Sequence, residues 1–260
     1  MFAAIPENIS TWVIVTIVIA AFLAGFVDAV AGGGGLIQLP VMLVAMPTLP
    51  IATILGTNKS VAVIGTSIAA NTYRKKIPAD RRVLVPMLVA AFIGSMAGAA
   101  LVSNIDRKIF EPIVLVILMA VAIFTIFKPA FGQHELVKSD VAVIKAAVIG
   151  GGIGFYDGLI GPGTGTFLLF ALVSVLGVTF LQASATAKFV NIATNLASIV
   201  VFLPFGHFIP MLFALMAPAN MLGGFIGART ALDKGSKFVR AIFIVMILVL
   251  ITRFFATLIG

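Results

Sequence analysis

Long apolar segments, separated by short polar or glycine-rich breaks, recur along the whole chain. Most of them approach the roughly 20 residues that a helix needs to cross about 30 Å of hydrocarbon, and proline or glycine flanks nearly every break. The pattern predicts long helices at 11–30, 51–73, 82–102, 109–127, 141–158, 181–203, 208–230 and 238–259. We therefore expect an all-α polytopic membrane protein.

Two further apolar pieces, 36–45 and 166–176, are too short to span a bilayer. Ten to twelve helical residues extend only about 15–18 Å, at about 1.5 Å per residue. Each piece follows a long helix and a glycine-rich break, at 32–35 in the first case and 161–165 in the second. We interpret both as return arms of re-entrant hairpins, because non-helical tips are tolerated at membrane depth only inside protein or beside a water-filled cavity.

The second half of the chain repeats the motifs of the first half at one constant spacing. The pairs are Gly25-Phe26-x-Asp28 with Gly154-Phe155-x-Asp157, Gly32 and Gly34 with Gly161 and Gly163, Thr57-x-Lys59 with Thr186-x-Lys188, and Gly94-x-x-x-Gly98 with Gly223-x-x-x-Gly227. All four pairs have the same separation in residue number as Asp28 and Asp157, and we call this separation the repeat offset. One offset for four separated motifs indicates duplication and fusion. We predict a first repeat at 1–127, a linker at 128–140 and a second repeat at 141–260 within one transmembrane domain, each repeat containing one broken hairpin and three full-length helices.

The distribution of lysine and arginine predicts that the two repeats are inverted relative to each other. Segments 73–82 and 229–240 contain five and four Lys or Arg residues, whereas their repeat counterparts, 202–211 and 100–111, contain none and two. With inverted halves one side of the membrane collects nine of these charges and the other side two, while halves in the same orientation show no bias. The positive-inside rule then places both basic segments and linker 128–140 in the cytoplasm.

The composition excludes several classes of function. The chain is 61% hydrophobic and 10% charged, so we assign its net charge of +8 to membrane topology and expect no nucleic-acid binding. It has no cysteine, which excludes disulfides and thiolate metal sites, and only two histidines, far apart, so we expect no metal and no cofactor. The phosphate-loop pattern GxxxxGK is absent, and no nucleophile or acid–base set suits an enzyme.

The two hairpin tips form the predicted binding site for a small anion. Half-helices starting at Leu36 and Thr166 direct free N–H groups and roughly half a positive charge each toward the tips. Glycine lets the backbone come close enough to a ligand for its amides to act as donors. The predicted substrate-binding residues are Gly32, Gly33, Gly34, Gly35, Thr57, Asn58, Lys59, Gly161, Gly163, Thr164, Gly165, Thr166, Thr186, Lys188 and Asn191.

Four charged residues lie inside apolar segments close to the tips. A lysine at mid-membrane costs roughly 2.5–3.5 kcal/mol, so Lys59 and Lys188 either attract the anion or extend their side chains to the interface. An acid beside an anion site repels the substrate. We therefore predict that Asp28 and Asp157 pair with the two lysines, bind tip amides or carry a coupling proton.

Two pairs of motifs resemble the sulfite exporter TauE/SafE family, also called TSUP. The stretch GFVDAVAGGGGL from Gly25, with GTNK from Gly56 downstream, is similar to the first-repeat signature of that family. The stretch GFYDGLIGPGTG from Gly154, with ATAKFVN from Ala185, is similar to the second-repeat signature. The resemblance implies a bacterial-type permease of the inner membrane whose substrates are sulfur-containing anions, such as sulfite, sulfoacetate and related organosulfonates.

Together these features predict a secondary transporter for a small sulfur-containing anion, working by alternating access around the hairpin tips. The chain contains no ATP-binding module, so an ion gradient is expected to drive transport, with protons as the candidate coupling ion. The alternatives are a passive anion channel and a transporter of other small organic acids. The expected partners are the small anionic substrate, protons as coupling ion and the lipid bilayer, and nothing in the sequence indicates an oligomeric state.

Overall fold

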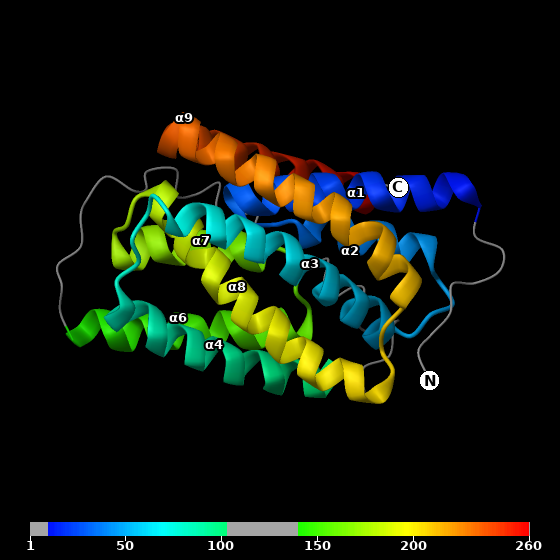
Figure 1. Ribbon diagram of the computed structural model, residues 1–260, viewed down its shortest axis with the longest axis horizontal. Helices are drawn as coiled ribbons and strands as arrows, with labels where there is room; N and C mark the ends of the chain where they lie inside the picture. Colours follow the sequence, from blue (N-terminus) through cyan, green and yellow to red (C-terminus); the bar gives the residue numbers. More distant parts are fainter. Residues whose placement is uncertain (1–9, 103–139, 260) are drawn as a thin grey trace.

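The computed structural model of the protein describes residues 10–102 and 140–259, and in these ranges it contains helices and no strands. The helices form one elongated bundle (Figure 1). They are α1 (Thr11–Ala31), α2 (Gly35–Ala45), α3 (Ile51–Arg74), α4 (Arg81–Val102), α6 (Asp140–Leu159), α7 (Thr164–Leu176), α8 (Phe180–Phe202), the short 3-10 helix η1 (Leu203–Phe205) and α9 (Pro210–Ile259).

The lengths of these helices agree with a multi-pass membrane protein. Six of the described helices are long and apolar enough to cross a bilayer, namely α1, α3, α4, α6, α8 with η1, and the part of α9 from Pro210 to Ile242. The helices α2 and α7 have 11 and 13 residues and are too short to do so. The all-α polytopic class predicted from the sequence is therefore confirmed.

The two broken hairpins lie where the sequence predicted them. Helix α1 ends at Ala31, and the next residue, Gly32, has a φ of 68°, in the left-handed region that favours glycine. Shortly afterwards α2 begins at Gly35 and packs back against α1. In the second half the turn between α6 and α7 uses Gly161 and Gly163, with φ values of 91° and 84°.

The repeat offset that relates the motifs also relates the contacts between the helices. The two most extensive interfaces pair α1 with α9 and α4 with α6, and the offset converts each interface into the other. A Cβ built on Gly98 would lie 2.2 Å from the carbonyl oxygen of Phe155, and one on its counterpart Gly227 would lie 2.5 Å from that of Phe26. Glycine at these positions therefore allows direct contact between helix backbones.

Helices that correspond in the two halves run in opposite directions. In Figure 1, α1 and α3 run from right to left, whereas their counterparts α6 and α8 run from left to right. The glycine contacts are consistent with this arrangement, because Gly223 faces Phe22 and Gly227 faces Phe26, so that α9 runs parallel to α1. This antiparallel relation is the one that inverted repeats require; the orientation of the chain in a membrane stays a prediction.

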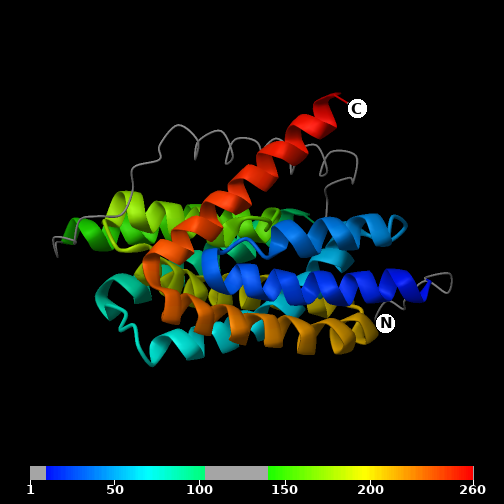
Figure 2. The same ribbon diagram turned by 90° about the horizontal axis from the view of Figure 1, so that it is seen from above.

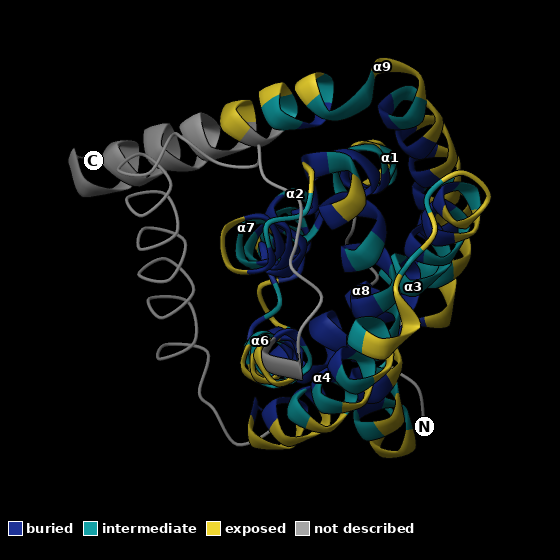
Figure 3. Ribbon diagram, turned by 90° about the vertical axis from the view of Figure 1, so that its left-hand side faces the viewer, coloured by how far each residue is buried: buried dark blue, intermediate teal, exposed yellow. Residues whose placement is uncertain are grey.

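The parts of the helices that face the interior of the bundle are coloured as buried, and the exposed parts lie on its outer surface (Figure 3), where many of the exposed residues are large and apolar. One core cluster contains Tyr73, Phe180 and Val239, and a second contains Met46, Phe202 and Leu212. The first cluster lies at the end of the molecule that carries the basic segments 74–82 and 229–240. Ile77 and Val83 pack against this cluster, as do Leu232 and Phe238, so both basic segments lie on one side of the bundle, as the charge count requires.

The C-terminal third differs from the sequence prediction. We expected separate helices at 208–230 and 238–259, but α9 starts at Pro210 and runs through the intervening segment, interrupted only at Gly235 with φ 73° and ψ −170°. The polar residues 233–237 lie at the end of the bundle, where water can surround them, so their polarity does not terminate the helix. Figure 2 shows α9 changing direction at this bend. The predicted helix 109–127 and most of linker 128–140 lie outside the described residues.

Candidate functional site

The tips of the two hairpins meet in the interior of the bundle. A Cβ built on Gly32 would lie 2.2 Å from the carbonyl carbon of Gly165, so any side chain at Gly32 would separate the two tips. Thr166 Oγ1 donates to the carbonyl oxygen of Gly32 at 2.7 Å. On the other side of the junction, Gly35 lies close to Pro162. The contact joins the first half of the chain directly to the second.

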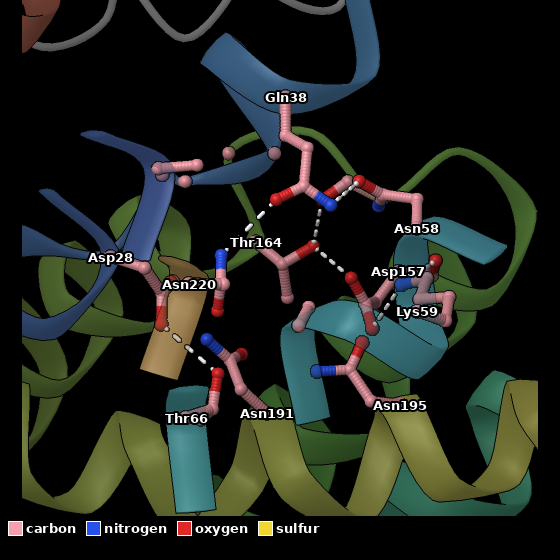
Figure 4. A pocket seen from close by; sticks show the side chains of 18 residues that line it. Asp28, Gln38, Asn58, Lys59, Thr66, Asp157, Thr164, Asn191, Asn195 and Asn220 are labelled. Carbon is pink, nitrogen blue, oxygen red and sulfur yellow. Dashed lines mark hydrogen bonds and ion pairs between the residues drawn. The ribbon is translucent and has the colours of Figure 1, made fainter. Parts of the chain in front are cut away.

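A small cavity lies beside this junction (Figure 4). Its volume is about 50 Å³, compared with roughly 10–15 Å³ needed for one water molecule, so it accommodates a solute of a few heavy atoms. The sequence-predicted residues that line it are Asp28, Gly33, Gly34, Gly35, Asn58, Lys59, Asp157, Gly161, Gly163, Thr164, Gly165 and Asn191. Residues distant in the sequence are thus brought together as the hairpin prediction required.

Lys59 forms a buried ion pair with Asp157 of the other half. Its Nζ lies 2.6 Å from Asp157 Oδ2, with the two side chains 3% and 6% exposed, and it also donates to the Asp157 backbone carbonyl at 2.8 Å. Thr164 Oγ1 donates to the second carboxylate oxygen, Asp157 Oδ1, at 2.5 Å. The carboxylate is thereby fixed at the cavity wall with its charge compensated.

Lys188 and Asp28 form the equivalent pair in the opposite sense. Lys188 Nζ lies 3.1 Å from Asp28 Oδ2 and also donates to the backbone carbonyl of Asp28. The lysine side chain is 0% exposed and the aspartate 18% exposed, so Asp28 lines the cavity and Lys188 lies behind it. Thr66 Oγ1 donates to Asp28 Oδ2 at 3.2 Å. Ion pairing, one of the roles predicted for the aspartates, is therefore observed, and each pair connects the two halves.

Amide side chains from three helices form a hydrogen-bonded chain along another part of the wall. Gln38 of α2 donates through Nε2 to Asn58 Oδ1 of α3 at 2.9 Å. Asn220 of α9 donates through Nδ2 to Gln38 Oε1 at 3.1 Å and to the carbonyl of Ala21 at 2.9 Å. These bonds satisfy polar groups that would otherwise be costly to bury in an apolar bundle.

The cavity is electrostatically suited to an anion. The two lysine–aspartate pairs cancel in formal charge, while α2 and α7 both begin at the cavity wall. Each helix N-terminus contributes roughly half a positive charge and N–H groups without intrahelical partners. The helix termini therefore add positive potential to a wall in which both lysines are paired.

Five of the sequence-predicted site residues lie outside the cavity wall, and these are Gly32, Thr57, Thr166, Thr186 and Lys188. Gly32 and Thr166 form the tip junction itself. Thr57 Oγ1 donates to the Thr53 carbonyl at 2.8 Å and accepts from Ile209 N at 3.0 Å, so its hydroxyl is already engaged. Thr186 is half-buried on α8 and does not line the cavity.

Six further wall residues were missed by sequence reasoning, and these are Ala24, Gln38, Ala62, Thr66, Asn195 and Asn220. Gln38, Asn195 and Asn220 could have been found, because an amide inside an otherwise apolar helix is costly unless it has a partner or a task. The two alanines carry no such signal. Within residues 10–102 and 140–259 no group of three His, Cys, Asp or Glu residues is placed to hold a metal ion.

Comparisons with known proteins identify one family of membrane proteins to which the chain is similar. The family described as Sulfite exporter TauE/SafE matches residues 17–254. A probable membrane transporter protein of a Sinorhizobium species is 34% identical over 92% of this chain and 90% of its own length. Similar proteins of Haemophilus influenzae and Escherichia coli, also named probable membrane transporters, are 34% and 32% identical over 86% and 87% of this chain and 88% and 83% of their own lengths. No solved structure gives a significant match.

Proposed function

The chain belongs to the sulfite exporter TauE/SafE family of membrane transporters, and we propose that it is a secondary transporter of a small sulfur-containing anion. Sulfite is the first candidate because the family is described by its export, and sulfoacetate or a related organosulfonate is the second. The anion binds in the cavity where the two hairpin tips meet.

One observation carries this proposal: two helix N-termini and a lysine converge on one small cavity. Because Lys59 is neutralised by Asp157, the attraction for an anion comes from the helix termini and their backbone N–H groups. Sulfite and sulfonate groups present three oxygens as acceptors for such donors. The cavity volume of about 50 Å³ suits a group of this size and requires the protein to open for a longer organosulfonate.

Alternating access is supported by the way the two halves are connected. Corresponding helices run in opposite directions (Figure 1), and both buried ion pairs join one half to the other. Rocking of one half against the other would expose the tips first to one side of the membrane and then to the other. We propose that a gradient drives this motion and that Asp28 or Asp157 carries a coupling proton when its lysine partner is displaced.

Flux into liposomes that contain the purified protein tests the proposal. Sulfite, sulfoacetate, taurine, sulfate and acetate are offered with and without a pH gradient, and protein-free liposomes correct for leakage. We expect saturable uptake of sulfite or sulfoacetate that responds to the pH gradient. Absence of saturable uptake of every anion contradicts a carrier, linear flux indicates a channel, and preference for acetate indicates a transporter of organic acids.

Two variants tie the flux to the cavity. Lys59→Ala removes the cation from the wall and leaves Asp157 without its partner, so we expect uptake to fall at least tenfold. Leu196→Ala changes a side chain on the same region of α8 that is 44% exposed on the outer surface of the bundle, and its uptake should match that of the unaltered protein. Unchanged affinity and rate in Lys59→Ala remove that lysine from the site.

A further inference from the structure

The cavity wall is the place where the two halves of the chain differ most clearly in chemistry. The charged residues are retained at the repeat offset, since Asp28 corresponds to Asp157 and Lys59 to Lys188. Most amide side chains of the wall are not retained at this offset. Four of the amides have an apolar residue at the corresponding position of the other half. These residues are Phe167 for Gln38, Ala187 for Asn58, Ala62 for Asn191 and Ala91 for Asn220.

The framework of the cavity is therefore twofold symmetric, whereas the hydrogen-bonding groups of its wall are one-sided. The ion pairs and tips provide the same groups from both halves, whereas these amides appear once each. A wall that is symmetric binds a ligand equally well in two orientations, and a one-sided wall of hydrogen-bonding groups selects one orientation. Three of the four amides are engaged with one another, since Gln38 bonds to both Asn58 and Asn220, and they hold α2, α3 and α9 in place.

Asn191 differs from those three amides. Its residue is 7% exposed and lines the cavity, yet its Oδ1 has no hydrogen-bond partner among the described residues. Its Nδ2 side faces Gly165, where a built Cβ would lie 3.0 Å away. In Figure 4 the Asn191 amide lies beside Thr66, among the labelled side chains of the cavity wall. A buried acceptor without a partner among these residues needs a donor from a water molecule or from a ligand in the cavity.

We infer that Asn191 accepts a hydrogen bond from the substrate, and that the transported ion is therefore a monoanion that also carries a hydrogen-bond donor. Hydrogen sulfite and hydroxy-substituted sulfonates belong to this class, whereas sulfate, sulfoacetate and unsubstituted sulfonates do not, so the inference excludes sulfoacetate as the second candidate of the proposed function. The inference rests on the proposed function, because it concerns the ligand of the same cavity. It adds a selectivity that the helix N-termini cannot provide, since they attract any small anion.

The charge and hydrogen-bond balance of the wall favour such a substrate over a dianion. The formal charges of the two ion pairs cancel, and two helix N-termini contribute roughly one positive charge together. Asp28 and Asp157 lie at the wall and repel a second negative charge. An anion with acceptors only would also leave Asn191 Oδ1 buried without a partner, and sites built around a hydrogen bond discriminate strongly against analogues that lack it.

A matched pair of ligands tests the inference. Ethanesulfonate and isethionate are both monoanions, and isethionate differs by one hydroxyl group. Their inhibition of radiolabelled sulfite uptake into proteoliposomes is measured with the unaltered protein, with Asn191→Ala and with Leu196→Ala. We expect isethionate to inhibit about tenfold more strongly than ethanesulfonate, as one hydrogen bond to a buried group implies. Asn191→Ala, which introduces the residue present at Ala62, should reduce that ratio to about one, while Leu196→Ala retains it.

The outcomes separate the inference from the proposed function. Equal inhibition by the two sulfonates in the unaltered protein overturns the inference and leaves the proposed function standing. A preference for isethionate that persists in Asn191→Ala assigns the acceptor to another residue and overturns the role of Asn191. If sulfite is not taken up, the proposed function fails and the inference falls with it. If Asn191→Ala does not fold, the ratio in the unaltered protein still decides whether the hydroxyl is recognised.

Discussion

Lys59 Nζ lies 2.6 Å from Asp157 Oδ2 although the two residues belong to different halves of the chain. The repeat offset converts this pair into Lys188 and Asp28, whose charged atoms lie 3.1 Å apart. Neither half can therefore neutralise its own buried lysine. The two halves depend on each other for the burial of charge, and this dependence fixes their relative position around the cavity.

Removal of one partner from the Lys59–Asp157 pair should be strongly destabilising. Lys59→Met leaves Asp157 buried without its cation, which we expect to lower the free energy of unfolding by about 3–5 kcal/mol. Lys59→Met combined with Asp157→Asn removes both charges and should recover most of that loss. Unfolding in detergent solution measures both variants. A double variant that is no more stable than Lys59→Met contradicts the coupling.

The second pair provides a comparison for the first. Asp28 is 18% exposed, whereas the Asp157 side chain is 6% exposed. Loss of its cation in Lys188→Met therefore leaves a carboxylate that water can partly solvate, so the destabilisation should be smaller than in Lys59→Met. The same unfolding measurement ranks the two variants, and the reverse order would contradict the assigned burial.

Gly32 should tolerate no side chain. Gly32→Ala places a Cβ 2.2 Å from the Gly165 carbonyl carbon, at a φ of 68° that disfavours other residues. Overpacking and backbone strain together should cost about 2–5 kcal/mol and separate the tips. Gly152→Ala is the matched control, because a Cβ there meets nothing within 4 Å. Gly32→Ala should lower both the thermal unfolding temperature and the sulfite uptake, whereas Gly152→Ala should change neither.

Inversion of the repeats predicts the sidedness of single cysteines. The chain contains no cysteine, so Lys75→Cys, Lys234→Cys and Phe205→Cys each introduce one thiol at a position that is exposed in the structure. Positions 75 and 234 should react with an impermeant maleimide from the cytoplasmic side, and position 205 from the opposite side. Reaction of positions 75 and 234 from different sides would reject the predicted topology.

His207 gives the protein a local sensitivity to acid. It lies between η1 and α9, where its Nδ1 is 3.2 Å from Thr53 Oγ1, and burial lowers its pKa below the ordinary value of 6.5. The unfolded chain then binds a proton before the folded chain does, so stability is complete above about pH 6.5 and falls as the pH decreases further. His207→Gln should flatten this part of the stability profile; an unchanged slope would contradict the assignment.

The repeat made the framework of the site predictable from sequence. Matching glycine runs and short helices located both hairpin tips, and the charge distribution indicated that the tips approach from opposite directions. The identity of the ion-pair partners could not be predicted, since Lys59 has two candidate aspartates in sequence. Only the folded position of the second hairpin tip, where Gly161 lies beside Lys59 Nζ, selects Asp157. Ala24 and Ala62 reach the wall through packing alone.

The polar wall shows a second limit of sequence reasoning. Thr57 and Asn58 are adjacent and equally polar, yet Thr57 bonds within its own helix to Thr53, as threonine hydroxyls in helices often do, and Asn58 faces the cavity. A difference of one residue rotates a side chain by about 100° around a helix of 3.6 residues per turn. Helix rotation is set by tertiary packing, which glycine contacts such as Gly56 with His207 and Gly65 with Asn220 define here.

The central claim is that one cavity at the two hairpin tips carries a small anion across the membrane. Exchange of radiolabelled sulfite into proteoliposomes preloaded with unlabelled sulfite tests it most directly, because only a carrier whose site alternates between the two sides is accelerated by substrate on the far side. We expect uptake that saturates with external sulfite, is accelerated by internal sulfite, and is lost in Gly32→Ala but not in Gly152→Ala. Uptake that rises linearly with external sulfite, without acceleration and equally in both variants, would contradict it.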